Sequence, residues 1–229
     1  MLGTLRRHLG GPATAPAVDA ARDEAPEPLA PATREVEFAG YAEDCRLFGF
    51  VRLADERMTD LLNEREELEV DSVLLVSLAD GRATEAAGMA IRRDDLLAVR
   101  AAGPRGNPER RRRTRPSPVT LQAGPYVIRG YVHGPPGADP ITQFRRRPPM
   151  VPLTEAWIEY VAAGEQHQAR VGTIIVNRDQ VDWIRVSKDA EVRLADLPAE
   201  TTIDPRAKDL TGHIRFGEAA TGGTGAGGE

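Results

Sequence analysis

The stretch VGTIIVNRDQVDWIRV, residues 171–186, decides how this chain is built, because GMAIRRDDLLAV at residues 88–99 is a weaker copy of it. Apolar and charged positions of the two stretches match at one constant separation of 85 residues. Similar stretches at a fixed separation indicate an internal repeat. We therefore expect two related domains. The matched pairs are Ile91 with Val176, Arg93 with Arg178, Asp94 with Asp179, Leu96 with Val181 and Val99 with Ile184.

The composition is that of an ordinary soluble globular protein. The 229 residues are 41% hydrophobic and 28% charged, which is enough to bury one medium core or two small ones. No run of about 18 apolar residues occurs, and no uninterrupted apolar stretch follows the charges at the N-terminus. We therefore expect a cytoplasmic protein with neither a membrane span nor a secretory signal.

The single cysteine, Cys45, excludes an internal disulfide framework and a multi-cysteine metal site. It follows Glu43 and Asp44, whereas a reactive thiol of low pKa needs basic neighbours. We expect Cys45 to be a small, half-buried residue in a reducing compartment. The four histidines show no paired spacing, so the sequence predicts no metal and no other cofactor.

Gly and Pro are concentrated at both ends and in the middle of the chain, which predicts folded domains between flexible segments. Residues 103–118 carry six Arg and one Glu among Pro and Gly, so we interpret them as a basic linker. The predicted division is a disordered arm over 1–35, a first small β domain over 36–102, the linker over 103–118, a second small β domain over 119–188, and an extension with a disordered Gly-rich tail over 189–229.

The first domain shows strand candidates separated by turn signals. Arg46–Leu53 is an apolar run, and Leu68–Leu78 is a longer one whose first half alternates between apolar and polar residues. Between them, Ala54–Asn63 predicts a polar turn into a short helix. Asp80 and Gly81 predict a hairpin turn, because this pair adopts positive φ at little cost.

The second domain repeats this order, and its organising strands include Trp183 and Ile184. Large aromatic residues usually dominate small cores, so we expect both side chains in the second core. The predicted fold class is mainly all-β, with two tandem small β-barrel domains and short helical turns. The further elements of the second domain are predicted at Tyr126–Val132, Ile141–Arg147 and Met150–Ala162.

The order Gly-x-Val, Asp-x-x-Met and Leu within Gly49–Leu62 resembles the first signature of the Sm-like small β-barrels, and Ile91–Val99 resembles the second. In that family, a helix precedes a five-stranded bent barrel, and the barrels form rings that hold single-stranded RNA. The turn Arg57–Asn63, RMTDLLN, is more similar to that of an uncharacterised bacterial family of small β domains, where it reads Arg-Ser-Asp-x-Leu-Asn. This better resemblance implies no activity.

The chain departs from the Sm-like pattern where that family contacts RNA. The Asn that follows Met in the first signature is Thr59 here. The Gly that follows Arg in the second signature is Arg93 in one copy and Arg178 in the other. In the second copy, Pro136 also takes the place of Asp55. The Sm-like resemblance therefore implies the topology and not RNA binding.

No recognisable catalytic set is present. Gly222–Gly228 leads to the last residue of the sequence and not into a helix, so it is not a phosphate loop. There is no Gly-x-Ser-x-Gly elbow, and the adjacent Asp94 and Asp95 would point to opposite faces of a strand. Residues 36–102 hold fifteen acidic and eight basic residues, while 119–188 hold six and eight. We interpret this asymmetry as complementary charge through which the two domains pack against each other or against neighbouring chains.

We interpret the protein as a non-catalytic binding or scaffold protein that presents two related small β-barrels to a protein partner or to another copy of itself. The alternative is binding of single-stranded RNA or another nucleic acid through the Arg-rich linker and loops, although the net charge of −5 and the few aromatic residues oppose it. A second alternative is an enzyme whose site is scattered along the sequence. Candidate nucleic-acid or anion contacts are Arg110, Arg111, Arg112, Arg113, Arg115, Arg145, Arg146 and Arg147; candidate partner contacts are Arg93, Asn177, Arg178 and Asp179.

Overall fold

A computed structural model describes residues 33–54, 56–104, 114–187, 198–200 and 203–207. The predicted arm over 1–35 and the Gly-rich tail therefore lie almost entirely outside the described residues. The described chain is mainly β, as predicted, with ten strands and two helices of seven residues each. Neither of these helices is long and apolar enough to span a membrane.

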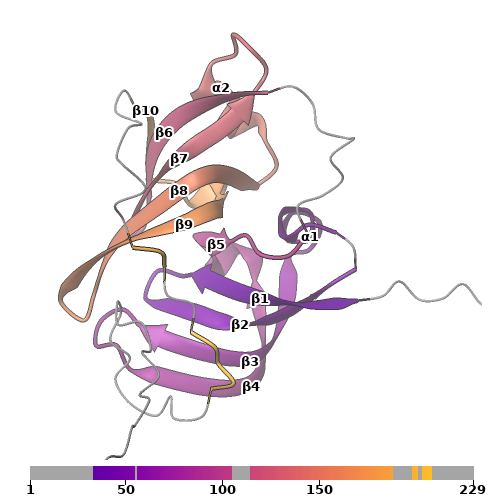
Figure 1. The fold of residues 1–229 in the computed structure, drawn as a ribbon, viewed down its shortest axis with the longest axis vertical. Coiled ribbons are helices and arrows are strands. Elements are labelled where there is room, and N and C mark those ends of the chain that lie inside the picture. Colours follow the sequence, from indigo (N-terminus) through magenta and orange to yellow (C-terminus); the bar gives the residue numbers. More distant parts are fainter. Residues whose placement is uncertain (1–32, 55, 105–113, 188–197, 201–202, 208–229) are drawn as a thin grey trace, which may run out of the picture. The chain divides into compact units, whose positions relative to one another are not determined.

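The first set of strands comprises β1 to β5 (Figure 1). Alternation in β3 buries Leu68 and Val70 while Glu67 and Glu69 face solvent, as predicted for a strand with one face on a core. Gly81 has a φ of 70° in the predicted hairpin turn. The elements are β1 (Arg34–Tyr41), β2 (Cys45–Leu53), α1 (Met58–Glu64), β3 (Glu67–Ser77), β4 (Ala83–Arg92), a 3-10 turn (Arg93–Asp95) and β5 (Ala98–Arg100).

The second set comprises β6 to β10 and follows the same order of elements. Its first strand, β6, begins at Arg115 inside the predicted linker. Pro116 fits there because it lies where β6 pairs only with β7. Pro118 fits because its contact on the β10 side is made by its carbonyl oxygen, which accepts from the Ser187 amide and requires no amide proton of the proline. The elements are β6 (Arg115–Ala123), β7 (Tyr126–Gly134), α2 (Pro140–Arg146), β8 (Met150–Ala162), β9 (Glu165–Asn177), a 3-10 turn (Arg178–Gln180) and β10 (Trp183–Val186).

Matching irregularities occur at matching places in the two sets. The pairing of β2 with β3 shifts register around Gly49, and that of β7 with β8 shifts around Gly130. Opposite these glycines, Ser72 and Glu155 have positive φ of 51° and 48°. A Cβ on Gly49 would lie 2.4 Å from a side-chain atom of Val70, so the strands approach too closely there for any larger residue.

The strands form one ten-stranded sheet in the order β10-β6-β7-β8-β9-β5-β1-β2-β3-β4. We expected two separate barrels; instead, antiparallel pairing of β5 with β9 joins the two sets, and the sheet is not closed (Figure 1). The two sets share their cores as well. Tyr41 and Ala98 of the first set pack in the cluster of the second, and Met150 and Ile175 of the second pack in the cluster of the first.

Asn63 at the end of α1 adds a polar contact between the two sets. Its amide group donates to the carbonyl oxygen of Met150 at 3.0 Å, and its Oδ1 accepts from the Met150 amide at 3.0 Å. The paired bonds fix α1 against the start of β8. The final residue of the turn motif therefore has a structural role.

Candidate binding surfaces

The end strand β10 carries the exposed apolar residues expected of a binding surface. Trp183 is 40% exposed and Val186 44%, while Ile184 between them packs against the core. The expectation that Trp183 lies in the core is therefore wrong, whereas Ile184 does contact it. The reason is the alternation of side chains along a strand: when Ile184 points inward, Trp183 and Arg185 must point outward.

Two polar contacts hold the Trp183 ring on the surface. Its Nε1 donates to Oε1 of Gln122 at 2.8 Å, and the guanidinium of Arg185 lies 5.8 Å from the ring centroid. The ring is thus fixed on the outer face of β6 and β10 with its apolar surface accessible. A fixed, exposed aromatic residue is the type of side chain that dominates protein interfaces.

The opposite end of the sheet is β4, a ten-residue strand of mostly small side chains. Met89 and Ile91 point toward the first core, and Ala87, Gly88 and Ala90 are exposed. Neither Lys nor Pro occurs in β4, although such residues commonly prevent association at sheet edges. Among the described strands, β4 pairs only with β3. Its other edge can therefore accept a further strand.

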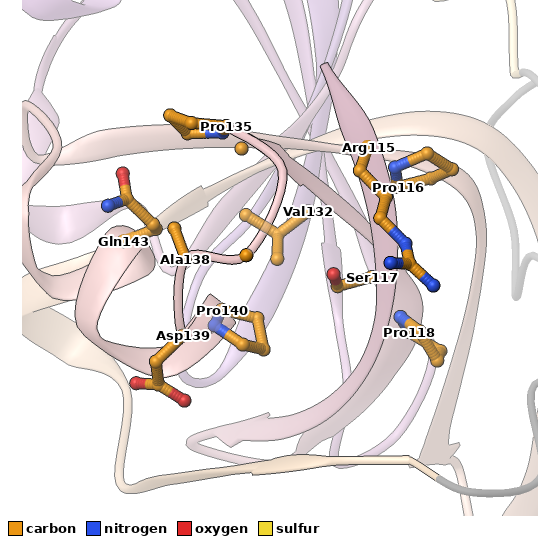
Figure 2. A pocket seen from close by; sticks show the side chains of 12 residues that line it. Arg115, Pro116, Ser117, Pro118, Val132, Pro135, Ala138, Asp139, Pro140 and Gln143 are labelled. Atoms are coloured by element: carbon orange, nitrogen blue, oxygen red, sulfur yellow. The ribbon is translucent and has the colours of Figure 1, made fainter.

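A pocket of about 360 Å³ lies between β6, the end of β7 and α2. Figure 2 shows Val132 between the loop that carries Pro135 and Ala138 and the strand that carries Arg115. Asp139 begins α2, where its Oδ2 accepts from the Thr142 amide at 2.7 Å. Hydrogen bonds from Thr142 hold the pKa of Asp139 below its usual value, as expected for an ionised carboxylate that caps a helix.

The described members of the predicted arginine set divide into exposed and internally bonded side chains. Arg115 lines the pocket, and Arg145 and Arg146 are exposed at the end of α2. Arg147 donates through Nη2 to the carbonyl oxygen of His133, and Arg178 donates through Nη1 to the carbonyl oxygens of Arg145, at 2.6 Å, and Arg147. The latter two guanidinium groups thus bind the protein's own backbone. The candidates Arg110, Arg111, Arg112 and Arg113 lie outside the described residues.

The predicted partner contacts lie around the two 3-10 turns, and Asn177 is buried. Its Oδ1 accepts from the Asp179 amide at 3.2 Å, and its Nδ2 donates to the Arg93 carbonyl oxygen at 3.4 Å. Asn177 therefore joins the equivalent turns of the two sets and is not available to a partner. Asp179 is exposed and pairs with Arg178 at 3.0 Å, and the largely buried Arg93 pairs with Asp94 at 3.5 Å.

Sequence reasoning missed a buried ionic cluster, the Arg46 cluster, formed by Arg46, Glu200, Tyr41 and Tyr160. The Arg46 and Glu200 side chains are 2% and 3% exposed, and Nη2 of Arg46 lies 2.7 Å from Oε1 of Glu200. Arg46 donates to the Tyr160 hydroxyl at 2.9 Å, and the Tyr41 hydroxyl donates to Oε2 of Glu200 at 2.5 Å. The guanidinium also lies 4.6 Å from the centroid of the Phe48 ring. No pattern in the sequence relates one Glu near the C-terminus to one Arg in a strand.

The Arg46 cluster fixes the charge states of its members. Burial raises the pKa of Tyr41 well above its ordinary value, and the carboxylate of Glu200 adds to this effect. Burial also raises the pKa of Tyr160, although Arg46 opposes the rise. For Arg46 itself, burial is the largest effect and lowers the pKa, but Glu200 together with Tyr41, Tyr160 and Tyr126 outweighs burial, and the net change is upward. Arg46 is thus cationic and both tyrosines are neutral, with the Tyr41 hydroxyl donating to Glu200 and the Tyr160 hydroxyl accepting from Arg46.

Glu200 belongs to a C-terminal segment, residues 198–200 and 203–207, that crosses the sheet. The Arg170 amide donates to the Pro198 carbonyl oxygen at 2.9 Å, and the Glu200 amide donates to that of Arg170 at 3.0 Å. Further on, Arg206 binds Glu35 with two hydrogen bonds of 2.7 and 2.9 Å. The segment therefore contacts both sets of strands. Ile203 packs on the cluster of Ala39, Phe48, Leu74 and Val76.

The remaining reactive residue types are arranged for structure. Burial, followed by the effect of Asp44, raises the pKa of Cys45 to about 11, which fits the predicted unreactive thiol. His133 bonds Thr154 at 2.7 Å and His167 stacks on Tyr160. Within the described residues, no three His, Cys, Asp or Glu side chains are grouped to hold a metal ion.

Comparison with protein-family models, with curated proteins and with solved structures finds no match for this chain.

Proposed function

We propose that this chain is a non-catalytic binding or scaffold protein that captures a protein partner by adding a strand of that partner to an edge of its sheet. The observation that carries the proposal is the exposure of Trp183 and Val186 on the short end strand β10. Strand addition supplies backbone hydrogen bonds, and the exposed Trp ring supplies apolar contact area beside them.

We also propose that the two sets of strands are tandem copies of one small β fold, joined edge to edge by β5 and β9 in an open sheet. The proposal is supported by the matching positions of elements in the two sets. Each set has a helix between its second and third strands and a 3-10 turn before its last. The shifted registers at Gly49 and Gly130 and the positive φ of Ser72 and Glu155 add to this correspondence. Because β5 of the first copy pairs with β9 of the second, the pair presents two different edge strands to partners, β4 and β10.

The test compares β10 with an exposed apolar residue elsewhere. Val161 in β8 is 58% exposed and serves as the matched control. The full chain and its Trp183→Ser and Val161→Ser variants are immobilised and exposed to extract of the native host, and retained proteins are quantified by mass spectrometry. Proteins retained by the wild type and by Val161→Ser should be lost with Trp183→Ser. Equal retention by all three forms would contradict the assignment to β10.

Nucleic-acid binding is the second candidate, favoured by the exposed Arg145 and Arg146 and by Arg115 near the same helix. It makes a different prediction. Affinity for single-stranded RNA should fall with salt, with a log–log slope of about −0.7 per phosphate neutralised, and replacing these three arginines by Gln should flatten the slope. We expect no such binding, because the chain carries a net charge of −5 and the nearby Arg147 and Arg178 bind backbone carbonyls.

A further inference from the structure

We infer that one partner of this chain is a second copy of itself, joined head to tail by pairing of β10 in one copy with β4 in the next. This inference rests on the proposed strand-addition function and names its partner. The two strands are the ends of the ten-stranded sheet (Figure 1). The chain already contains a junction built from the equivalent strands, so the geometry of the missing contact can be read from it.

The internal junction pairs the fifth strand of the first set with the fourth strand of the second. Ala98, Val99 and Arg100 of β5 lie opposite Val176, Ile175 and Ile174 of β9. Bonds of 2.9 Å extend the pairing at both ends, from the Asn177 amide to the Leu97 carbonyl oxygen and from the Ala101 amide to that of Thr173. Val99 and Ile175 are fully buried at this junction.

Among the described strands, the two with an unpaired edge are equivalent to the two strands that form this junction. The fourth strand of the first set is β4, and the fifth strand of the second set is β10. The strands β5 and β10 begin in the same way. The Leu97 amide before β5 donates to the Tyr41 carbonyl oxygen at 2.9 Å, and the equivalent Asp182 amide before β10 donates to the Gln122 carbonyl oxygen at 2.9 Å. A junction made of two different strands leaves one complementary half at each end, and copies can therefore join head to tail.

The backbone groups at both free edges point in the direction that the junction needs. Residues of an antiparallel strand alternate between bonding one neighbour and facing the other side. The Arg93 amide bonds the Glu66 carbonyl oxygen, so Arg93 and every second residue before it bond to β3. Ala90 lies three residues before Arg93, and its amide and carbonyl groups therefore face away from β3. The Ser187 amide bonds the Pro118 carbonyl oxygen, so Ser187 and every second residue before it bond to β6. The amide and carbonyl groups of the residues between them, Ile184 and Val186, therefore face away from β6.

The register of β5 with β9, applied to the equivalent residues of β10 and β4, gives a specific set of pairs. Trp183 lies opposite Ile91 of the second copy, Ile184 opposite Ala90, and Arg185 opposite Met89. Pairing would cover Trp183 and Val186, two of the three large apolar residues that are exposed in the described chain. Cross-strand partners share a face of the sheet, so the Trp183 ring, which takes the place of Ala98 at the internal junction, would lie beside Ile91 and Met89.

Charge complementarity favours this order of joining. Residues 36–102, which include β4, hold fifteen acidic and eight basic residues, while 119–188, which include β10, hold six and eight. The end of one copy therefore meets an end of opposite sign on the next. Joining like ends, β4 to β4, would instead bring two acidic sets together.

The test uses one proline at each edge of the full chain. Ala90→Pro removes an outward amide from β4, and Val186→Pro removes one from β10; both spare the bonds to the neighbouring strand. Ala90→Thr keeps the amide and is the matched control. Each form is examined by light scattering after size-exclusion chromatography over a range of concentrations, with circular dichroism to verify folding. If Ala90→Pro does not fold, Ala90→Glu takes its place and sets a charge against Ile184.

The expected result is that the wild type and Ala90→Thr associate as concentration rises, while each proline variant alone remains a monomer. An equimolar mixture of the two proline variants should stop at a dimer, because it contains one intact β10 and one intact β4. A wild type that stays monomeric at all concentrations, oligomers that persist in both variants, or a mixture that remains monomeric would each overturn the inference. If the wild type is monomeric while Trp183→Ser still loses a captured protein, the proposed function stands and self-association fails.

Discussion

The sharpest prediction on stability concerns Glu200, which neutralises the buried Arg46. Glu200→Ala leaves a guanidinium that is only 2% exposed without its carboxylate partner at 2.7 Å. Removing one member of a buried pair typically costs about 3–5 kcal/mol, because the remaining charge is desolvated and uncompensated. The Tyr160 hydroxyl and the Phe48 ring still contact Arg46, so we expect a value near the lower limit, about 3 kcal/mol.

The assay is urea unfolding followed by circular dichroism, with the free energy of unfolding extrapolated to zero denaturant. The double variant Arg46→Met/Glu200→Leu should recover much of the loss, because it removes both charges and keeps the volume apolar. Glu35→Ala breaks the exposed pair with Arg206 and is the matched control, with a smaller effect expected. A loss below about 1 kcal/mol for Glu200→Ala, or a double variant less stable than the single one, would refute this account of the cluster.

Two further predictions concern alkaline pH and strand packing. Burial raises the pKa of Tyr41, which therefore keeps its proton in the folded state while the unfolded chain loses it near pH 10. The free energy of unfolding should thus fall above about pH 10, by at most about 1.4 kcal/mol per pH unit for this group, and Tyr41→Phe should flatten the fall in urea titrations. Gly49→Ala places a Cβ 2.4 Å from a side-chain atom of Val70 in β3 and should destabilise the protein by about 1–3 kcal/mol. Gly88→Ala is the control, because the nearest atom to its Cβ lies at 3.5 Å and no loss of stability is expected. Thermal unfolding of the two variants measures the difference.

The sequence alone determined the local elements and their repetition. Alternation in Leu68–Leu78 identified β3, and Asp80 with Gly81 identified the following turn, because strand periodicity and positive φ are properties of a few neighbouring residues. The separation of 85 residues between Ile91 and Val176 placed those residues at equivalent positions of β4 and β9. Such signals do not depend on where the rest of the chain lies.

Tertiary structure decided which strands meet and which side chains are covered. Alternation along β10 allows only one of Trp183 and Ile184 to face the core, and it was the packing of β10 at the end of the sheet that turned Ile184 inward and left Trp183 exposed. Pairing of β5 with β9 converted two expected barrels into one sheet. Arg46 and Glu200 lie far apart in sequence, and only folding brings these opposite charges out of water together, where each makes the burial of the other tolerable.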